Sequence, residues 1–251
     1  MLTDPAFYLV GIPAVLLYGV AKGGFGGAVA ILAVPLMTLM MPQAQAAAIL
    51  LPILMVMDLV VIYSYRGHYD GRALRLLVPG AVVGVAAGYL LADTMNEDFM
   101  RLLVGLVACV FGAQALLGWL SHVGRKHNVW GASFFGTLSG FTSFSIHAGG
   151  PPITMYLLPK GLPPMVYAGT AGLFFWVVNL LKLPAYYFLG QLSIANLAYS
   201  LALVPFAPLG VLLGKRLVSA SNPRFYYRLI AMFLVIVGFK LTWDGLAGLT
   251  A

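Results

Sequence analysis

Long apolar stretches alternate with short segments that hold most of the charged residues. A helix that spans a membrane needs about 20 apolar residues. Six stretches fit this length, namely residues 44–65, 73–92, 102–120, 165–189, 194–213 and 225–243. The pattern therefore predicts six membrane-spanning helices.

Two further apolar regions, residues 7–41 and 130–158, are interrupted. The first interruption is the run Lys22, Gly23, Gly24, Phe25, Gly26 and Gly27, and the second contains Ser143, Ser145, His147, Gly149, Gly150 and Pro151. Glycine runs unwind a helix and proline fits best in a first turn, so each region is predicted to form two half-helices joined by irregular backbone. At membrane depth such backbone is tolerated only where it is buried in protein or lines a cavity.

The second half of the chain repeats the first. Residues 77–85 return as 203–211, Gly26-Gly27 aligns with Gly149-Gly150, and Asp58 aligns with Asn179. The boundary falls near Arg125, which gives halves of 1–125 and 126–251, each a broken segment followed by three spans. The fold class that follows is an all-α polytopic membrane protein built from two repeats.

Charge placement predicts how the repeats are oriented. If each broken segment enters and leaves on one side, one face collects Arg66, Arg72, Arg75, Arg125, Lys126, Lys160, Lys215, Arg216, Arg224 and Arg228 against Asp70 alone. The other face then receives Asp4, Asp93, Glu97, Asp98 and Asp244, with Arg101 as its single base. Because basic loops favour the cytoplasm, this arrangement predicts two inverted repeats, with both termini in the periplasm of a bacterial inner membrane.

Composition excludes other classes of protein. Hydrophobic residues make up 61% of the chain and charged residues 8%, against roughly 45–50% and about 25% in soluble domains, so the solvent is predicted to be lipid. The net charge of +7 is scattered, which argues against nucleic acid as a partner. The glycine run lacks the GxGxxG order of a nucleotide site, and the loop histidines lack matched carboxylates, so neither a cofactor nor a metal is expected.

Inverted repeats that contain broken helices indicate a secondary transporter whose substrate site lies where the breaks meet. Half-helices that begin at the breaks would direct free N–H groups and positive dipole ends at this site, which favours an anion. Lys22 adds a positive charge beside the first break. Ser143 and Ser145 add hydroxyl donors beside the second, and His147 would donate a hydrogen bond or carry a proton.

These residues also have plainer interpretations. Lys22 would otherwise extend to the membrane interface, although the cost of an intramembrane charge favours function. Ser143 and Ser145 would cap freed backbone groups, and His147 would be a packing residue. Asp58, inside an apolar helix, would bind a coupling proton, counter Lys22 or form a purely structural ion pair. Asn179 is its partner by repeat, and Lys182, one turn further, faces the same cavity or has a structural role.

The two interrupted segments resemble a known family. The run Gly23-Gly24-Phe25-Gly26-Gly27 with Val34-Pro35 resembles the first-half signature of the TauE/SafE sulfite exporter family. Residues 140–142 and 147–152, followed by residues 167–170 and Asn179, are similar to the second-half signature. The resemblance implies transport of small anions that contain sulfur or carboxylate, such as sulfite or sulfoacetate, with the glycine-rich breaks as the substrate region.

The leading hypothesis is an exporter of a small sulfur-containing anion that works by alternating access. A proton as coupling ion and assembly into a homo-oligomer are left open. The alternatives are an anion channel or a carboxylate transporter of the same architecture. A membrane-embedded enzyme would need an acid–base or metal cluster that the few acidic residues do not supply, and the paired breaks argue against a purely structural scaffold.

Overall fold

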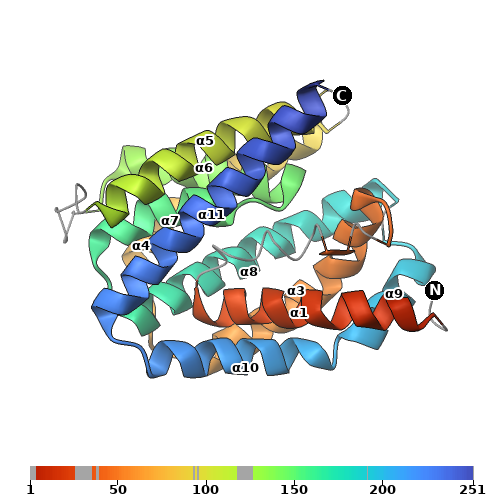
Figure 1. Cartoon of the computed structure of the whole chain (residues 1–251), viewed down its shortest axis with the longest axis horizontal. Helices are drawn as coiled ribbons and strands as arrows, with labels where there is room; N and C mark the ends of the chain where they lie inside the picture. Colours follow the sequence, from red (N-terminus) through yellow and green to blue (C-terminus); the bar gives the residue numbers. More distant parts are fainter. Residues whose placement is uncertain are drawn as a thin grey trace.

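The computed structural model describes residues 4–25, 36–37, 40–92, 94, 96–117, 127–190 and 192–250. Of the predicted first break, Lys22, Gly23 and Gly24 are helical rather than unwound, and Gly26 and Gly27 lie outside the described residues. Every regular element in these ranges is helical. The helices are α1 (Pro5–Gly24), α3 (Gln43–Ser64), α4 (Gly71–Leu90), α5 (Glu97–Leu116), α6 (Val129–Ile146), α7 (Gly150–Leu157), the 3-10 helix η2 (Leu158–Lys160), α8 (Pro164–Phe188), α9 (Ile194–Leu203), α10 (Phe206–Ser219) and α11 (Pro223–Thr250) (Figure 1).

Short polar side chains begin several of these helices. The Asp70 carboxylate accepts hydrogen bonds from the N–H groups of Arg72 and Ala73, both 3.0 Å, at the start of α4. The same kind of cap starts α1, α5, α6 and α9, at Asp4, Asn96, Asn128 and Ser193. Because the first N–H groups of a helix have no partner within it, these caps fix where each helix begins.

Six helices of the described chain are long and apolar enough to cross a membrane: α1, α3, α4, α5, α8 and α11. The multi-pass membrane protein predicted from the sequence is thus confirmed. One predicted span differs, because residues 194–213 do not form a single helix. The chain bends by 47° between α9 and α10, where Pro205 cannot donate a backbone hydrogen bond to continue the helix.

Contacts show which helices begin at the same end of the bundle. The rings of Phe7, on α1, and Tyr199, on α9, lie 5.4 Å apart, and Gln45, on α3, donates a hydrogen bond of 3.3 Å to Asn196, on α9. Helices α1, α3 and α9 therefore begin together. Both termini lie at this end, opposite the turn between α10 and α11 (Figure 1).

The segment α6–α7–η2 begins and finishes at the opposite end. His127, just before α6, lies 3.1 Å from the Asp70 carboxylate, and Lys160, at the end of η2, interacts electrostatically with the same carboxylate. Asp70 N–H also donates to the Thr170 hydroxyl on α8 at 2.8 Å. The predicted second broken segment thus enters and leaves on one side. Inverted repeats would produce this arrangement, and the symmetry itself stays a prediction.

Glycines bring the main helix pairs into backbone contact. A Cβ atom on Gly84 of α4 would lie 2.0 Å from the carbonyl oxygen of Thr137 on α6, and one on Gly210 of α10 would lie 2.8 Å from that of Leu16 on α1. Gly84 aligns with Gly210 in the repeat that the sequence predicts. Small residues thus allow close approach of α4 to α6 and of α10 to α1.

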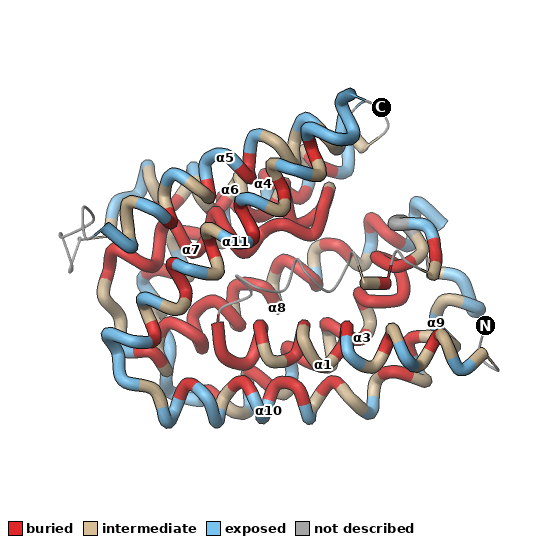
Figure 2. Tube along the Cα trace, in the orientation of Figure 1, coloured by how far each residue is buried: buried red, intermediate tan, exposed pale blue. Residues whose placement is uncertain are grey.

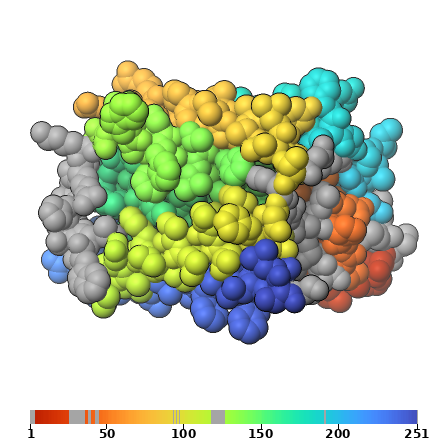
Figure 3. All heavy atoms as spheres, turned by 90° about the horizontal axis from the view of Figure 1, so that it is seen from above, coloured from red at the N-terminus to blue at the C-terminus, as the bar shows by residue number. Residues whose placement is uncertain are grey.

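The remaining architecture is an apolar core inside an apolar outer surface. Buried residues face the middle of the bundle, and exposed residues lie on the outer sides of α4, α5, α10 and α11 (Figure 2). Many exposed residues are large and hydrophobic, including Val83, Val110 and Phe239. Helix α5 and the end of α11 lie side by side on one such face (Figure 3). An outer surface of this kind suits contact with lipid tails.

Candidate functional site

The break between α6 and α7 is built from His147, Ala148 and Gly149. His147 has a left-handed backbone (φ 55°), and it is the only non-glycine residue with positive φ in the described chain. Such a conformation costs roughly 1–2 kcal/mol for most residues. The turn it produces directs the chain back into α7 and places the imidazole ring at the break.

Hydroxyl groups of α6 satisfy the carbonyls of the break. The Thr142 hydroxyl donates to Ala148 O at 3.0 Å, and the Ser139 hydroxyl donates to Gly149 O at 2.7 Å. Ala148 N–H in turn donates to Thr142 O at 3.0 Å. The carbonyl groups of Ala148 and Gly149 are thus satisfied, and the N–H groups that follow Ala148 remain to be accounted for.

Only two of these N–H groups exist at the start of α7. Pro151 and Pro152 have no N–H, and the N–H of Ile153 donates to Gly149 O at 3.4 Å. Gly149 and Gly150 are therefore the backbone donors that remain between Ala148 and Ile153. A Cβ atom on Gly149 would lie within 2.9 Å of Ser139 O, Ser143 and Phe175, so this position has no room for a side chain.

A small buried cavity lies between the break and helices α1 and α8. Its volume is about 20 Å³, which is roughly the space for one water molecule. The residues that line it are Tyr18, Lys22, Ser143, His147, Gly149, Gly150, Phe175 and Asn179. Six of these eight are residues that the sequence singles out, and the structure brings them together from α1, α6, α7, α8 and the α6–α7 break.

His147 presents an unpaired nitrogen in this region. The side chain is 7% exposed, and its Nε2 atom has no hydrogen-bond partner among the described residues. The ring lies 6.4 Å from the ring of Tyr186 on α8. Buried polar atoms in native proteins nearly always have a partner, so an unpaired one in a polar cavity points to a ligand or a water.

A buried ion pair adjoins the cavity. Lys22 pairs with the Asp58 carboxylate and also donates to Leu54 O at 3.2 Å. Asn179 donates to the other carboxylate oxygen of Asp58 at 2.7 Å. None of these three side chains is more than 3% exposed. Lys22 therefore does not extend to the interface, and of the alternatives for Asp58 the structure shows the pairing with Lys22.

Lys182 lies beside this pair, on the same helix as Asn179. It is 1% exposed and lies close enough to Lys22, Asp58 and His147 to interact electrostatically with each. The structure gives it no hydrogen bond to another described residue. Two buried lysines therefore share one buried carboxylate.

Four predicted site residues lie away from the cavity. Gly23 and Gly24 pack against the backbone of α10, where a Cβ atom on Gly23 would lie 2.2 Å from Val211 O. The Phe25 ring packs on Tyr226 and Phe233 of α11. The Ser145 hydroxyl donates to Phe141 O at 2.9 Å, one turn back along α6. The described part of the first break thus contacts α10 and α11, and Lys22 alone reaches the cavity.

Comparison with protein families decides what kind of protein this is. The profile of the family described as "Sulfite exporter TauE/SafE" matches residues 11–241, which includes both breaks, the ion pair and Lys182. The chain belongs to the TauE/SafE family. This family implies a membrane transporter of sulfur anions, which accords with a protein that is not an enzyme. No curated protein and no solved structure matches the chain.

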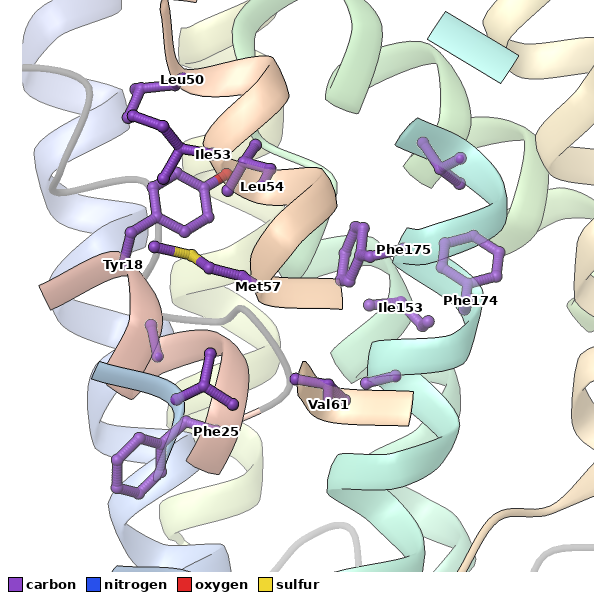
Figure 4. Packing of buried hydrophobic residues seen from close by; sticks show 14 of the residues in the cluster. Tyr18, Phe25, Leu50, Ile53, Leu54, Met57, Val61, Ile153, Phe174 and Phe175 are labelled. Carbon is purple, nitrogen blue, oxygen red and sulfur yellow. The ribbon is translucent and has the colours of Figure 1, made fainter. Parts of the chain in front are cut away.

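Tyr18 and Phe175 are the cavity residues of this TauE/SafE protein that sequence reasoning misses. Each lies four positions before a polar cavity residue, Tyr18 before Lys22 and Phe175 before Asn179. Residues four apart share a helix face, so this spacing is the signal that would have found them. Figure 4 shows Tyr18 against Leu54 and Met57 of α3, with Phe175 near Ile153 of α7.

Proposed function

We propose that this TauE/SafE protein exports a small sulfur-containing anion, such as sulfite or an organosulfonate, by binding it in the cavity between α1, α8 and the α6–α7 break. The observation that carries the proposal is the unpaired Nε2 atom of buried His147 beside the N–H groups of Gly149 and Gly150. A tetrahedral or pyramidal oxyanion presents several acceptor oxygens, and a set of converging donors of this kind suits it.

Charge and polarity around the cavity support an anion over a cation. Lys22 lines it, and Lys182 lies within electrostatic reach. The carboxylate of Asp58 is engaged by Lys22 and Asn179, so it does not present a free acceptor to a cation. The start of α7 adds the positive end of a short helix.

The size of the cavity supports alternating access. It has space for about one water, so an anion with four or more heavy atoms enters only when the elements around the break move apart. Transporters with this kind of broken helix move one repeat against the other around a fixed site. The carboxylate transporter of the same architecture remains the second candidate, because a carboxylate would use the same donors.

The direction of transport follows from orientation and voltage. With the loops around Arg66, Arg72 and Lys160 in the cytoplasm of a bacterial inner membrane, anion export moves negative charge away from a negative interior. The gain is about 2.3 kcal/mol per charge per 100 mV, so export needs no coupling ion. A coupling proton on Asp58 or His147 would add to this drive.

Flux measurements in proteoliposomes test the proposal. Vesicles loaded with labelled sulfite or ethanesulfonate should release the anion at a rate that saturates with its concentration. Release should become faster when unlabelled anion is added outside, which does not happen with a channel. Ser143→Ala should reduce the flux, while the matched change Ser219→Ala, at the end of α10, should not. If neither anion is released faster than from anion-loaded vesicles without the protein, the assigned substrate class is wrong.

A further inference from the structure

The charges buried at the centre of the bundle do not cancel. Three charged side chains share this region, and each is 3% exposed or less: Lys22, Asp58 and Lys182. The fourth buried charged residue of the described chain, Lys160, lies at the end of the bundle beside Asp70. With ordinary ionisation, the central cluster sums to one positive charge.

The undescribed part of the first break does not change this sum. Residues 23–57 contain no acidic, basic or titratable side chain. Wherever residues 26–35 lie, they bring neutral groups only. Outside the described chain, residues 118–126 contain no acidic side chain, and Asp93 lies in the sequence between α4 and α5. Asp58 is thus the one buried carboxylate of the described chain, and two buried lysines lie beside it.

We infer that the transported anion carries a single negative charge and that this charge neutralises the Lys22–Asp58–Lys182 cluster. The inference rests on the proposed anion site and narrows its substrate. An uncompensated charge in a low-dielectric interior is costly in either sign. A univalent anion brings the filled site to neutrality, whereas a divalent anion replaces one excess positive charge with one excess negative charge. This holds whether Lys182 holds its proton beforehand or gains it as the anion arrives.

The charge rule divides the candidate substrates. Hydrogensulfite and simple alkanesulfonates are univalent and satisfy it. Sulfite dianion and sulfoacetate, which carry two negative charges at neutral pH, do not. The donors at the break, the His147 ring and the N–H groups of Gly149 and Gly150, would donate to the sulfur-bound oxygens of either set. Charge therefore distinguishes ligands that the donors treat alike.

Two ligands of nearly equal shape provide the test. Sulfoacetate carries two negative charges, and its amide analogue, sulfoacetamide, carries one. We expect sulfoacetamide and ethanesulfonate to bind the purified protein about tenfold more tightly than sulfoacetate, measured by calorimetry or ligand-dependent thermal unfolding at fixed ionic strength. Equal or tighter binding of sulfoacetate would overturn the charge rule and leave the anion site standing. If no sulfonate of either charge binds, the proposed function itself is wrong.

Lys182→Met provides a second test, whose first readout needs no ligand. The substitution removes the unbalanced charge, so the ligand-free protein should unfold at a higher temperature than wild type. The affinity for univalent sulfonates should fall about tenfold. A lysine with only a structural role would show the opposite shift in unfolding temperature. Lys240→Met, which removes the same charge from the half-buried pair with Asp244, is the matched control and should keep wild-type sulfonate affinity.

Discussion

Asn179 donates a 2.7 Å hydrogen bond to Asp58, the residue with which it aligns in the predicted repeat. Both side chains are almost fully buried. The hydrogen bond joins α3 of the first half to α8 of the second, beside the proposed anion cavity. Of the two side chains only Asp58 is ionisable, so Asn179 holds the carboxylate without adding a charge.

The pairing of Lys22 with Asp58 should dominate the stability of the centre of the bundle. Asp58→Asn leaves the lysine buried and unpaired, which costs about 3–5 kcal/mol for a pair of this kind. Lys22→Met in the same chain should recover much of the loss, because the unpaired charge is then removed. Thermal unfolding of the two single variants and the double variant measures the coupling. Losses that simply add would contradict a direct pair.

Close packing of α4 on α6 should make Gly84 intolerant of any side chain. A methyl group there would meet Thr137 O at 2.0 Å, and forcing extra atoms into a packed contact costs about 1–3 kcal/mol. Gly131→Ala is the matched control in a helix, since its nearest neighbour would lie 3.6 Å away. We expect Gly84→Ala to lower the unfolding temperature and Gly131→Ala to leave it unchanged or raise it.

Two substitutions separate the backbone of His147 from its ring. Glycine adopts the positive φ without strain, so His147→Gly should retain nearly all of the unfolding free energy, whereas His147→Ala should lose roughly 1–2 kcal/mol. Both variants lack the imidazole and should bind sulfonates more weakly. Wild-type sulfonate affinity in His147→Gly would show that the ring does not take part in binding.

Cysteine labelling checks the orientation of the bundle. The only native cysteine is Cys109, on α5, so a Cys109→Ala background carries no thiol. In that background Tyr69→Cys, in the loop before α4, should react with a membrane-impermeant maleimide only in inverted vesicles. Thr94→Cys, between α4 and α5, should react in intact spheroplasts. The reverse pattern would place the basic loops outside the cytoplasm.

Local features of the sequence predict much of the fold. Apolar runs of membrane-spanning length predict the spans, and the second break falls where Gly149, Gly150 and two prolines interrupt an apolar segment. The bend between α9 and α10 is not predicted, because a run of apolar residues alone does not show whether a span that contains Pro205 stays straight. The polar residues of the breaks are also recognisable, since few such residues occur inside apolar segments.

Composition and the lengths of the apolar runs were enough to predict a membrane protein, and internal similarity and glycine-rich interruptions predicted a repeat with its chemistry at helix breaks. Tertiary structure decided which of those residues meet. It placed Lys22 on Asp58, turned Gly23 and Gly24 toward α10, and added Tyr18 and Phe175 to the cavity. Run length and composition are properties of one segment, whereas the neighbour of a side chain depends on packing between segments that are far apart in the sequence.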